Sequence, residues 1–312
     1  MNIIEENDNY AKSVDNFFGS SIWQNFKLKA NKWDNLVYLK YLDTVFPVLI
    51  KKIRNYSVGY CVSGPYVYSE KSKDFEKYIK NELFRKYKVN IFIFNSVPNG
   101  IESGIDFQYN ISPRNYYVLD LKDYSESSIN SKYRGRVRNK LGFNFEYTDS
   151  PDESCIKTFY SIYSDCATIK GFKNKDYIYI SQLIDTLSVE KKVIVAKVKY
   201  KGKVIASSIN VLGYDSAYYL YSGITKDSSI VRGYPGYYLV YETAVLLKNL
   251  GFKSYNLWGG DLNKKDWFGF TEFKLNMGSS IVGEYKQKCI AKSKIDMLLF
   301  KLINKYIYTY EF

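Results

Sequence analysis

Histidine is absent from the 312 residues of this sequence. The absence excludes every catalytic relay in which an imidazole activates a serine or cysteine, and it excludes histidine-ligated zinc. Any catalysis must therefore use lysine, tyrosine, carboxylates, backbone amides or the substrate itself. We accordingly expect an enzyme with no metal site and no tightly bound cofactor.

Cysteine is scarce, and long apolar runs are missing. The four cysteines, Cys61, Cys155, Cys166 and Cys289, form no C-x-x-C pair, so reduced thiols are expected rather than a disulfide framework. The first ten residues lack the basic start and apolar run of a signal peptide. No stretch approaches the roughly 18 uninterrupted apolar residues of a membrane span. We expect a cytoplasmic protein, with peripheral contact at the inner membrane face left open.

Tyrosine and positive charge are abundant instead. The chain has 33 tyrosines and a formal net charge of +13. The tyrosines fit the composition bias of an AT-rich genome, although some are suited to line a site because the side chain joins a flat apolar ring to a polar hydroxyl. The charge predicts an anionic partner, either RNA, a phosphate-bearing small molecule or an acidic membrane surface.

The second half of the chain has a regular order of predicted elements. Periodicity and turn residues predict two helices, a hairpin, a strand, a buried helix and a strand, over residues 151–168, 176–188, 193–200, 203–212, 216–222, 237–250 and 253–258. Gly251 stands at a good position to end the buried helix. This order resembles that of the GNAT-type N-acyltransferase fold.

The first half repeats the core of this order more faintly. Three strands, a helix and a strand are predicted over residues 36–41, 45–53, 56–62, 72–87 and 89–94. We therefore predict an α/β protein with mixed, α+β-type sheets, built from two tandem GNAT-like lobes. The expected lobes are residues 1–148 and 149–286, and a C-terminal helix within 287–312 is expected to pack back on the first lobe.

A strongly basic segment lies between the two halves. The pattern predicts one helix from Asp123, with Glu126 as its capping partner, to Gly142. Five cations and no anion fall within nine of its residues: Lys132, Arg134, Arg136, Arg138 and Lys140. Like charges at this spacing destabilise an isolated helix, so a countercharge is expected. The segment is either a phosphate-binding helix, or a solvated helix, or a helix whose cations pair with carboxylates of the chain itself.

Three stretches resemble a known family. They are YRGRVRNKLGF (133–143) after the strand 116–121, the helix, strand and Gly-Gly turn of 234–261, and GFTEFKLNMGSSIVGEY (269–285). Together they resemble the FemABX aminoacyltransferases of the bacterial cell wall. The resemblance implies amide formation, in which an amino acid passes from aminoacyl-tRNA to an amine of an anionic, phosphate-bearing peptidoglycan-type precursor. It also implies that Lys132, Arg134, Arg136 and Arg138 bind RNA or phosphate.

The resemblance carries specific site residues. It implies that Lys274, in the Phe273-Lys274 pair, stabilises the oxyanion of the tetrahedral intermediate, and that Phe273 contacts substrate. Lys175, Tyr179 and Tyr221 correspond to substrate-binding positions. We expect Lys274 to be an exposed lysine at the approach to a strand.

Two positions depart from the family pattern. Lys175 replaces an arginine, so bidentate phosphate recognition is lost. Asn95 replaces a residue that is often acidic. The resemblance therefore does not identify the acceptor.

Two other functions stay open. One is an acyl-CoA-dependent N-acyltransferase acting on an amino sugar or nucleotide sugar in surface-polysaccharide synthesis, with Arg232, Gly233 and Gly236 as a loose pyrophosphate cradle. The other is a non-catalytic protein that binds RNA or a membrane surface. For the latter, the amphipathic segment 291–308 could lie on a membrane.

Overall fold

The chain folds into two compact units. The computed structural model describes residues 2–62, 64–65, 67, 74–96, 105–106, 115–138, 142–227, 233–284 and 286–311. The first unit combines Met1–Arg114 with Gly283–Phe312, and the second is Asn115–Val282.

These boundaries differ from the sequence-based ones at 148/149 and 286/287. Strand β6 (Asn115–Asp120) hydrogen-bonds into the sheet of the second unit, although it lies within the first predicted lobe in the sequence. Strand β13 (Lys286–Ala291) hydrogen-bonds into the sheet of the first unit. Backbone pairing between segments far apart in sequence therefore sets the boundaries.

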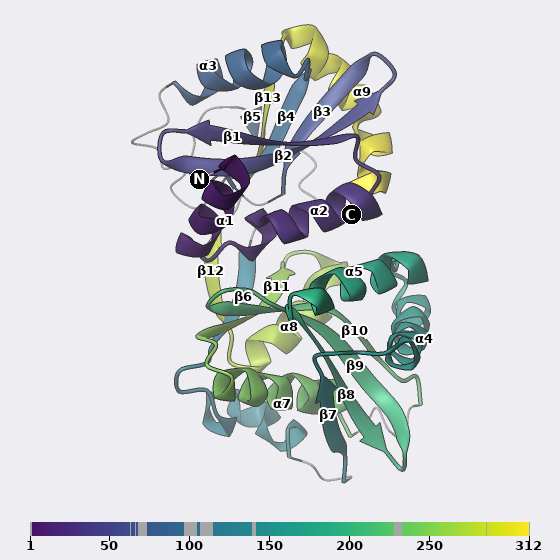
Figure 1. The fold of residues 1–312 in the computed structure, drawn as a ribbon. Coiled ribbons are helices and arrows are strands. Elements are labelled where there is room, and N and C mark those ends of the chain that lie inside the picture. Colours follow the sequence, from purple (N-terminus) through teal and green to yellow (C-terminus); the bar gives the residue numbers. More distant parts are fainter. Residues whose placement is uncertain are drawn as a thin grey trace. The chain divides into compact units, whose positions relative to one another are not determined.

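The second unit contains a seven-stranded sheet with the order β12-β6-β11-β10-β9-β8-β7 (Figure 1). Its other strands are β7 (Asn144–Thr148), β8 (Val193–Tyr200), β9 (Lys203–Leu212), β10 (Ser216–Ile224), β11 (Ser254–Gly260) and β12 (Ser280–Glu284). Its α-helices are α4 (Glu153–Lys170), α5 (Tyr177–Val189), α7 (Pro235–Asn249) and α8 (Lys265–Asn276). The order of helices and strands predicted for this half is confirmed.

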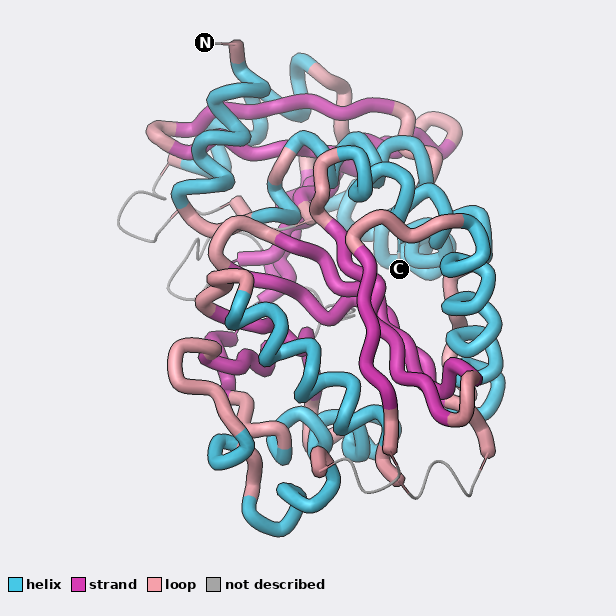
Figure 2. The backbone as a smooth tube through the Cα atoms, turned by 60° about the horizontal axis from the view of Figure 1, so that its bottom comes forward, coloured by secondary structure: helices cyan, strands magenta, loops and turns pink. Residues whose placement is uncertain are grey.

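Helices cover both faces of this sheet. Successive strand residues point to opposite faces, so Ile194, Ala196 and Val198 of β8 share a core with α7, while Val193 and Val195 are buried on the other side. Helix α4 packs on β9 and β10. Figures 1 and 2 show the helices lying along the sheet on its two sides.

The basic segment does not form the predicted helix. Two short 3-10 helices, η4 (Glu126–Ser128) and η5 (Ser131–Arg136), stand in its place, and the prediction of one helix from Asp123 to Gly142 is wrong. Ile129 between them is extended, and the Asn130 amide donates a hydrogen bond to the backbone of α8 instead of continuing a helix. Tertiary contacts thus override the local helical pattern; Lys140 lies outside the described residues.

The first unit contains a six-stranded sheet with the order β1-β2-β3-β4-β13-β5. Its other strands are β1 (Asn35–Tyr41), β2 (Thr44–Ile53), β3 (Tyr56–Cys61), β4 (Ile91–Ser96) and β5 (Ile105–Asp106). Its helices are α1 (Ile3–Ser13), η1 (Phe17–Gly19), α2 (Ser21–Ala30), α3 (Phe75–Ile79), η3 (Lys80–Lys86) and α9 (Lys294–Glu311). Both units share the order of two helices, three strands, a helix and a strand.

Helix α9 completes one of the two cores of the first unit. Phe300 is fully buried and packs with Trp33, Leu49 and Tyr60 in a core separate from the one that contains α3. The Asp296 carboxylate accepts a hydrogen bond from Asn90 at 2.8 Å and fixes the start of the helix. Leu298, two residues before Phe300, is 62% exposed.

Replacing a side chain by alanine should have different effects on the buried and the exposed face of α9. We expect Phe300→Ala to lower the free energy of unfolding by about 3–5 kcal/mol, because it empties a buried site. Leu298→Ala should change it by no more than about 0.5 kcal/mol, because this side chain is exposed. Urea unfolding followed by circular dichroism measures both. Equal effects of the two substitutions would contradict the packing of α9 on this core.

Candidate functional site

Two neighbouring parallel strands separate in the middle of the second sheet. Ser216–Tyr218 of β10 pair with Ser254–Asn256 of β11. Among the described residues, the two strands do not pair with each other beyond this stretch. An irregularity at Tyr219/Tyr221 bends β10, and one before Gly259 bends β11. The carboxyl ends of parallel strands that part in this way are a common ligand site in α/β proteins.

Lys274 lies beside this opening. Its side chain is only 7% exposed, and Nζ donates a hydrogen bond to the Gly259 carbonyl at 2.6 Å. The Phe270 ring lies 4.9 Å from Nζ on the same helix. The sequence led us to expect an exposed lysine at the approach to a strand, which is wrong. The residue is in the last turn of α8, whose inner face it shares with Thr271.

Gly260 permits this close packing of α8 on β11. A Cβ atom at Gly260 would lie 2.6 Å from Thr271 Oγ1 and 2.8 Å from the Tyr117 ring, so no larger residue fits. Thr271 Oγ1 accepts a hydrogen bond from the Asp261 amide at 3.0 Å. The turn after β11 is therefore fixed against the helix that carries Lys274.

Burial makes the Lys274 amine unusual. Removal from water disfavours the charged form, and it lowers the pKa of Lys274 from 10.5 to about 7. Among the described residues no carboxylate forms an ion pair with it. Near neutral pH this amine can therefore donate hydrogen bonds as an ammonium ion or accept a proton as a neutral base.

A second group of predicted residues does come together. Lys175 Nζ lies 5.0 Å from the centre of the Tyr179 ring, and the Tyr179 and Tyr221 rings meet edge to face at 6.4 Å. Tyr163 of α4 joins them, with its ring 5.6 Å from that of Tyr221. Its hydroxyl accepts a hydrogen bond from the Lys175 amide at 3.3 Å. We call Tyr163, Tyr179 and Tyr221 the tyrosine cluster.

Two members of the tyrosine cluster, Tyr163 and Tyr221, are neutral phenols at neutral pH. Burial raises the pKa of Tyr163 to about 12 and raises the pKa of Tyr221 well above its ordinary value. These hydroxyls can donate hydrogen bonds at neutral pH but cannot act as bases there. Tyr163 was missed in the sequence, where it was one more aromatic residue of a helix. Gly223 brings α4 close, since a Cβ there would lie 2.7 Å from the Ile162 carbonyl.

The cations of the basic segment are largely engaged within the chain. Arg134 donates hydrogen bonds to the backbone carbonyls of Ile129 and Ser127 at 3.0 and 2.8 Å. Arg138 donates two hydrogen bonds to one Glu126 oxygen at 2.9 and 2.7 Å. Arg138 therefore has a carboxylate partner, which the sequence left as an alternative to phosphate, whereas the partners of Arg134 are backbone carbonyls.

Arg136 has an aromatic environment instead. Its guanidinium lies 4.3 Å from the Tyr133 ring, 4.2 Å from that of Tyr234 and 4.9 Å from that of Tyr237. Tyr234 is the residue that precedes α7, so this arginine lies near the amino end of that helix. Phe273 packs edge-on against Tyr237 at 4.7 Å. Phe273 thus joins this group, while Lys274 turns toward β11.

Lys132 is the remaining predicted phosphate ligand. It is exposed, and its amine lies 5.5 Å from the Tyr133 ring. No ion pair involves it among the described residues. It is therefore available to an external anion.

No three Cys, Asp or Glu side chains lie close enough to hold a metal ion in the part of the chain that the structure describes. The four cysteines are free thiols. No helix within the described ranges is long and apolar enough to cross a membrane.

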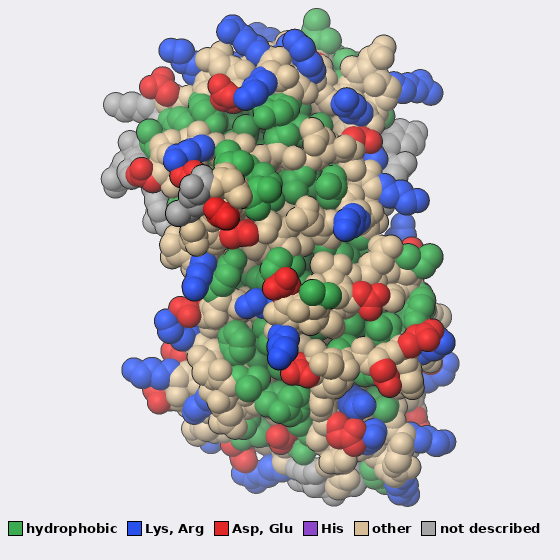
Figure 3. Space-filling model, viewed as in Figure 1, with side chains coloured by type: hydrophobic (Ala, Val, Ile, Leu, Met, Phe, Trp, Pro, Cys, Tyr) green, Lys and Arg blue, Asp and Glu red, His purple; other side chains and the backbone are tan. Residues whose placement is uncertain are grey.

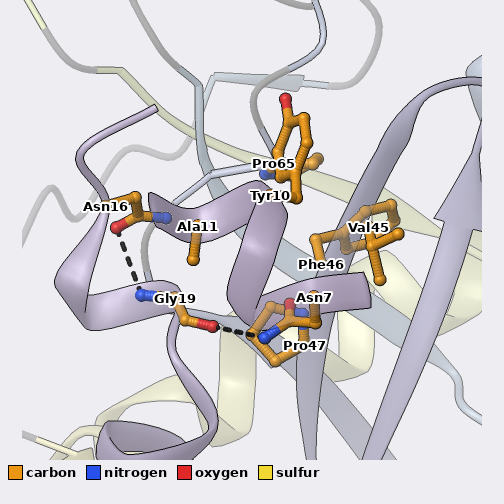
Figure 4. A pocket seen from close by; sticks show the side chains of 9 residues that line it. All are labelled: Asn7, Tyr10, Ala11, Asn16, Gly19, Val45, Phe46, Pro47 and Pro65. Atoms are coloured by element: carbon orange, nitrogen blue, oxygen red, sulfur yellow. Dashed lines mark hydrogen bonds between the residues drawn. The ribbon is translucent and has the colours of Figure 1, made fainter. Parts of the chain in front are cut away.

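A small pocket in the first unit contains none of the predicted site residues. It lies between α1, η1 and β2, and Asn7 and Asn16 contribute its amide side chains (Figure 4). Asn7 donates a hydrogen bond to the Gly19 carbonyl at 3.0 Å, and Asn16 accepts one from the Gly19 amide at 3.2 Å. These amides are used to hold η1 against α1, so the pocket is not the candidate site.

The repeated order of elements and the separated strand pair define a tandem GNAT-type N-acyltransferase fold. Comparison with solved structures shows which tandem GNAT-type proteins have a similar fold. The chain is similar to FemX, with a TM-score of 0.75 at 14% identity over 96% of this chain and 98% of that chain. The predicted FemABX-like fold is confirmed.

Two further structures are similar over most of their length. The C-terminal domain of a putative lysylphosphatidylglycerol synthetase from Agrobacterium fabrum has a TM-score of 0.60 at 11% identity, covering 96% of each chain. A tandem GNAT protein from the clavulanic acid biosynthesis pathway has a TM-score of 0.51 at 8% identity, covering 86% of this chain and 88% of that chain. The sequence matches no protein-family model, and it matches no curated protein sequence significantly. At these identities the likeness shows the fold.

The buried amine predicts a pH-dependent difference in stability. Between pH 7 and 10 the unfolded chain binds more protons at Lys274 than the folded chain does, so the contribution of Lys274 to the free energy of unfolding rises with pH. Lys274→Met lacks this group. We expect the free energy of unfolding of the wild type, relative to that of the variant, to increase by up to about 1.4 kcal/mol per pH unit in this range. Urea unfolding at several pH values measures it, with Lys265→Met as the exposed control. A constant difference would show that Lys274 titrates normally.

Proposed function

We propose that this chain is an aminoacyltransferase that forms an amide bond. The donor is an aminoacyl-tRNA, and the acceptor is an amine of an anionic cell-envelope precursor of the peptidoglycan type. The acceptor nitrogen attacks the ester carbonyl, a C–N bond forms, the C–O bond to the ribose breaks, and the amine loses a proton. The observation that carries the proposal is the buried Lys274 amine at the separation of β10 and β11.

Lys274 is suited to the charge that develops in this reaction. The attacked carbonyl oxygen becomes an oxyanion, and an ammonium group in a desolvated site stabilises it far more strongly than one in water. The hydrogen bond to Gly259 holds the amine in place before the substrate arrives. The neutral phenols of Tyr163 and Tyr221 supply hydrogen-bond donors for the acceptor.

The two groups of residues lie toward opposite faces of the sheet. Tyr163 and Tyr179 belong to α4 and α5, whereas Thr271 of α8 packs by Tyr117 in the core that contains α7. Between these faces, β10 and β11 are not paired with each other beyond Tyr218 and Asn256. We propose that the donor ester and the acceptor amine approach from the two faces and meet where the strands part.

The donor would be held by cations of the basic segment. Lys132 has no ion-pair partner among the described residues. Arg138 has only a surface pair with Glu126 among the described residues, and an exposed pair of this kind is weak enough to be exchanged for a phosphate. Arg134 is less suited, because it holds backbone carbonyls.

A specific observation favours an acyl-CoA donor as the second candidate. Arg136 lies next to Tyr234 at the amino end of α7, where the helix dipole and unpaired amides favour an anion such as a pyrophosphate. Arg232 of the predicted cradle lies outside the described residues. An amino sugar or nucleotide sugar would then be the acceptor.

The donor can be tested directly. We expect ribonuclease treatment of the charged-tRNA mixture to abolish transfer, and Lys132→Glu/Arg138→Glu to raise the apparent KM for charged tRNA several-fold. The second effect follows from lost phosphate contacts and should shrink as salt is raised. Lys191→Glu/Lys201→Glu, which reverses two exposed charges elsewhere in the second unit, is the matched control. Transfer from purified acyl-CoA in RNA-free buffer would overturn the tRNA proposal and establish the second candidate.

Lys274 should control the rate rather than binding. We expect Lys274→Met to lower kcat by on the order of 100-fold, as removal of one oxyanion-stabilising donor does. Because the ammonium form is required, the wild-type rate should fall as the pH rises through about 7, and Lys274→Met should lack this limb. A limb with the same midpoint that rises with pH would instead make Lys274 the base that accepts the amine proton. An unchanged kcat would remove Lys274 from the site.

A further inference from the structure

Exposed cations gather at one end of the sheet in the first unit. The β2–β3 turn, the approach to β4 and the exit from β13 lie together there, because Ile53 pairs with Tyr56 and Ile91 pairs with both Val58 and Ala291. These loops and the start of α9 carry Arg54, Lys88, Lys292 and Lys294, all exposed. Figure 3 shows Lys and Arg side chains along this upper end of the unit.

These four cations have no countercharge from the chain. Within the described residues, none of them forms an ion pair. Asp296, the nearest carboxylate in sequence to Lys292 and Lys294, accepts hydrogen bonds from Asn90 at 2.8 Å and from the Ser293 hydroxyl at 2.6 Å. The positive charge at this end of the sheet is therefore available to an external anion.

An apolar stripe continues from the cations along α9. Ile295, Leu298, Leu299 and Leu302 follow the helical i, i+3, i+4, i+7 spacing and are 44–71% exposed. The core contacts of the helix are made by other residues, Met297 and Phe300. The stripe is therefore not needed to pack α9 within the unit. Lys294 and Lys301 are also exposed on this helix.

The orientation of the stripe is fixed by contacts at the start of α9. Ser293 Oγ accepts a hydrogen bond from the Asp296 amide at 3.1 Å and caps the helix. The Tyr56 hydroxyl donates to the Asp296 carbonyl at 2.8 Å. These bonds hold the first turns against the sheet, so the apolar side chains are kept on the outer side.

We propose that this α9 surface docks on an anionic lipid bilayer. The surface consists of an apolar stripe and adjacent cations: Ile295, Leu298, Leu299, Leu302, Arg54, Lys88, Lys292, Lys294 and Lys301. The stripe inserts at the boundary between headgroups and acyl chains, and the cations contact lipid phosphates. This combination distinguishes a bilayer from other partners. RNA would use the cations but not the leucines, and a symmetric second copy would bring like charges together.

General physical chemistry gives the expected effect of each side chain on partitioning to vesicles. One cation near an anionic surface changes the partition coefficient about fivefold. One leucine transferred from water into the boundary changes it by on the order of tenfold. The proposal does not depend on the proposed transferase function, because the surface shares no residue with the Lys274 site.

Vesicle sedimentation of the full chain tests the proposal. Vesicles of phosphatidylglycerol and phosphatidylcholine are compared with vesicles of phosphatidylcholine alone. We expect binding to the anionic vesicles and at least a tenfold loss of partitioning in Leu298→Ser/Leu302→Ser and in Lys292→Glu/Lys294→Glu. Added salt should weaken wild-type binding but affect the charge-reversed variant less. Circular dichroism checks that each variant is folded, as expected for exposed positions.

Matched controls lie in the second unit. Val189→Ser removes an exposed apolar side chain, and Lys122→Glu/Lys191→Glu reverses two exposed charges; both should bind as the wild type does. Leucine variants with unchanged binding would overturn the proposal and leave the cations to another polyanion such as RNA. A chain that binds no vesicles but forms a dimer lost in Leu298→Ser/Leu302→Ser would assign the stripe to a second copy.

Discussion

The close packing of α8 on β11 is the constraint on which the candidate site depends. Because Gly260 has no side chain, Thr271 and Lys274 lie directly against the strand. Carbonyls at the end of the same helix accept hydrogen bonds from Asn130 and Tyr124. One helix end therefore positions the Lys274 amine and also anchors the basic segment, which couples the two parts of the second unit that the proposed transfer would use.

The order of helices and strands could be predicted because it rests on local periodicity and turn residues. The grouping of Lys175, Tyr179 and Tyr221 also followed from the sequence through the family resemblance. The burial of Lys274 could not, since a lysine in a short polar-apolar stretch gives no sign of the face it occupies. The basic segment was misread as one helix because the hydrogen bond from Asn130 to α8 is not local.

A chain without histidine must use other titratable side chains, here lysine and tyrosine, to donate or accept protons. Burial moves the pKa of Lys274 down toward neutrality and moves that of Tyr221 further up. Lys274 can then change its charge near neutral pH, while Tyr221 stays a neutral hydrogen-bond donor. The abundance of tyrosine also serves packing, as Arg136 among three tyrosine rings shows.

The origin of β13 has a consequence for biosynthesis. Residues 286–291 are translated after the whole of the second unit, yet they pair with β4 of the first. While the ribosome is making the second unit, the nascent first unit presents β4 as an unsatisfied sheet edge, with Phe92 and Phe94 on it. Such an edge is prone to pair with the wrong strand. The sheet of the first unit can therefore be completed only after residues 286–291 have been made and released to pair with β4.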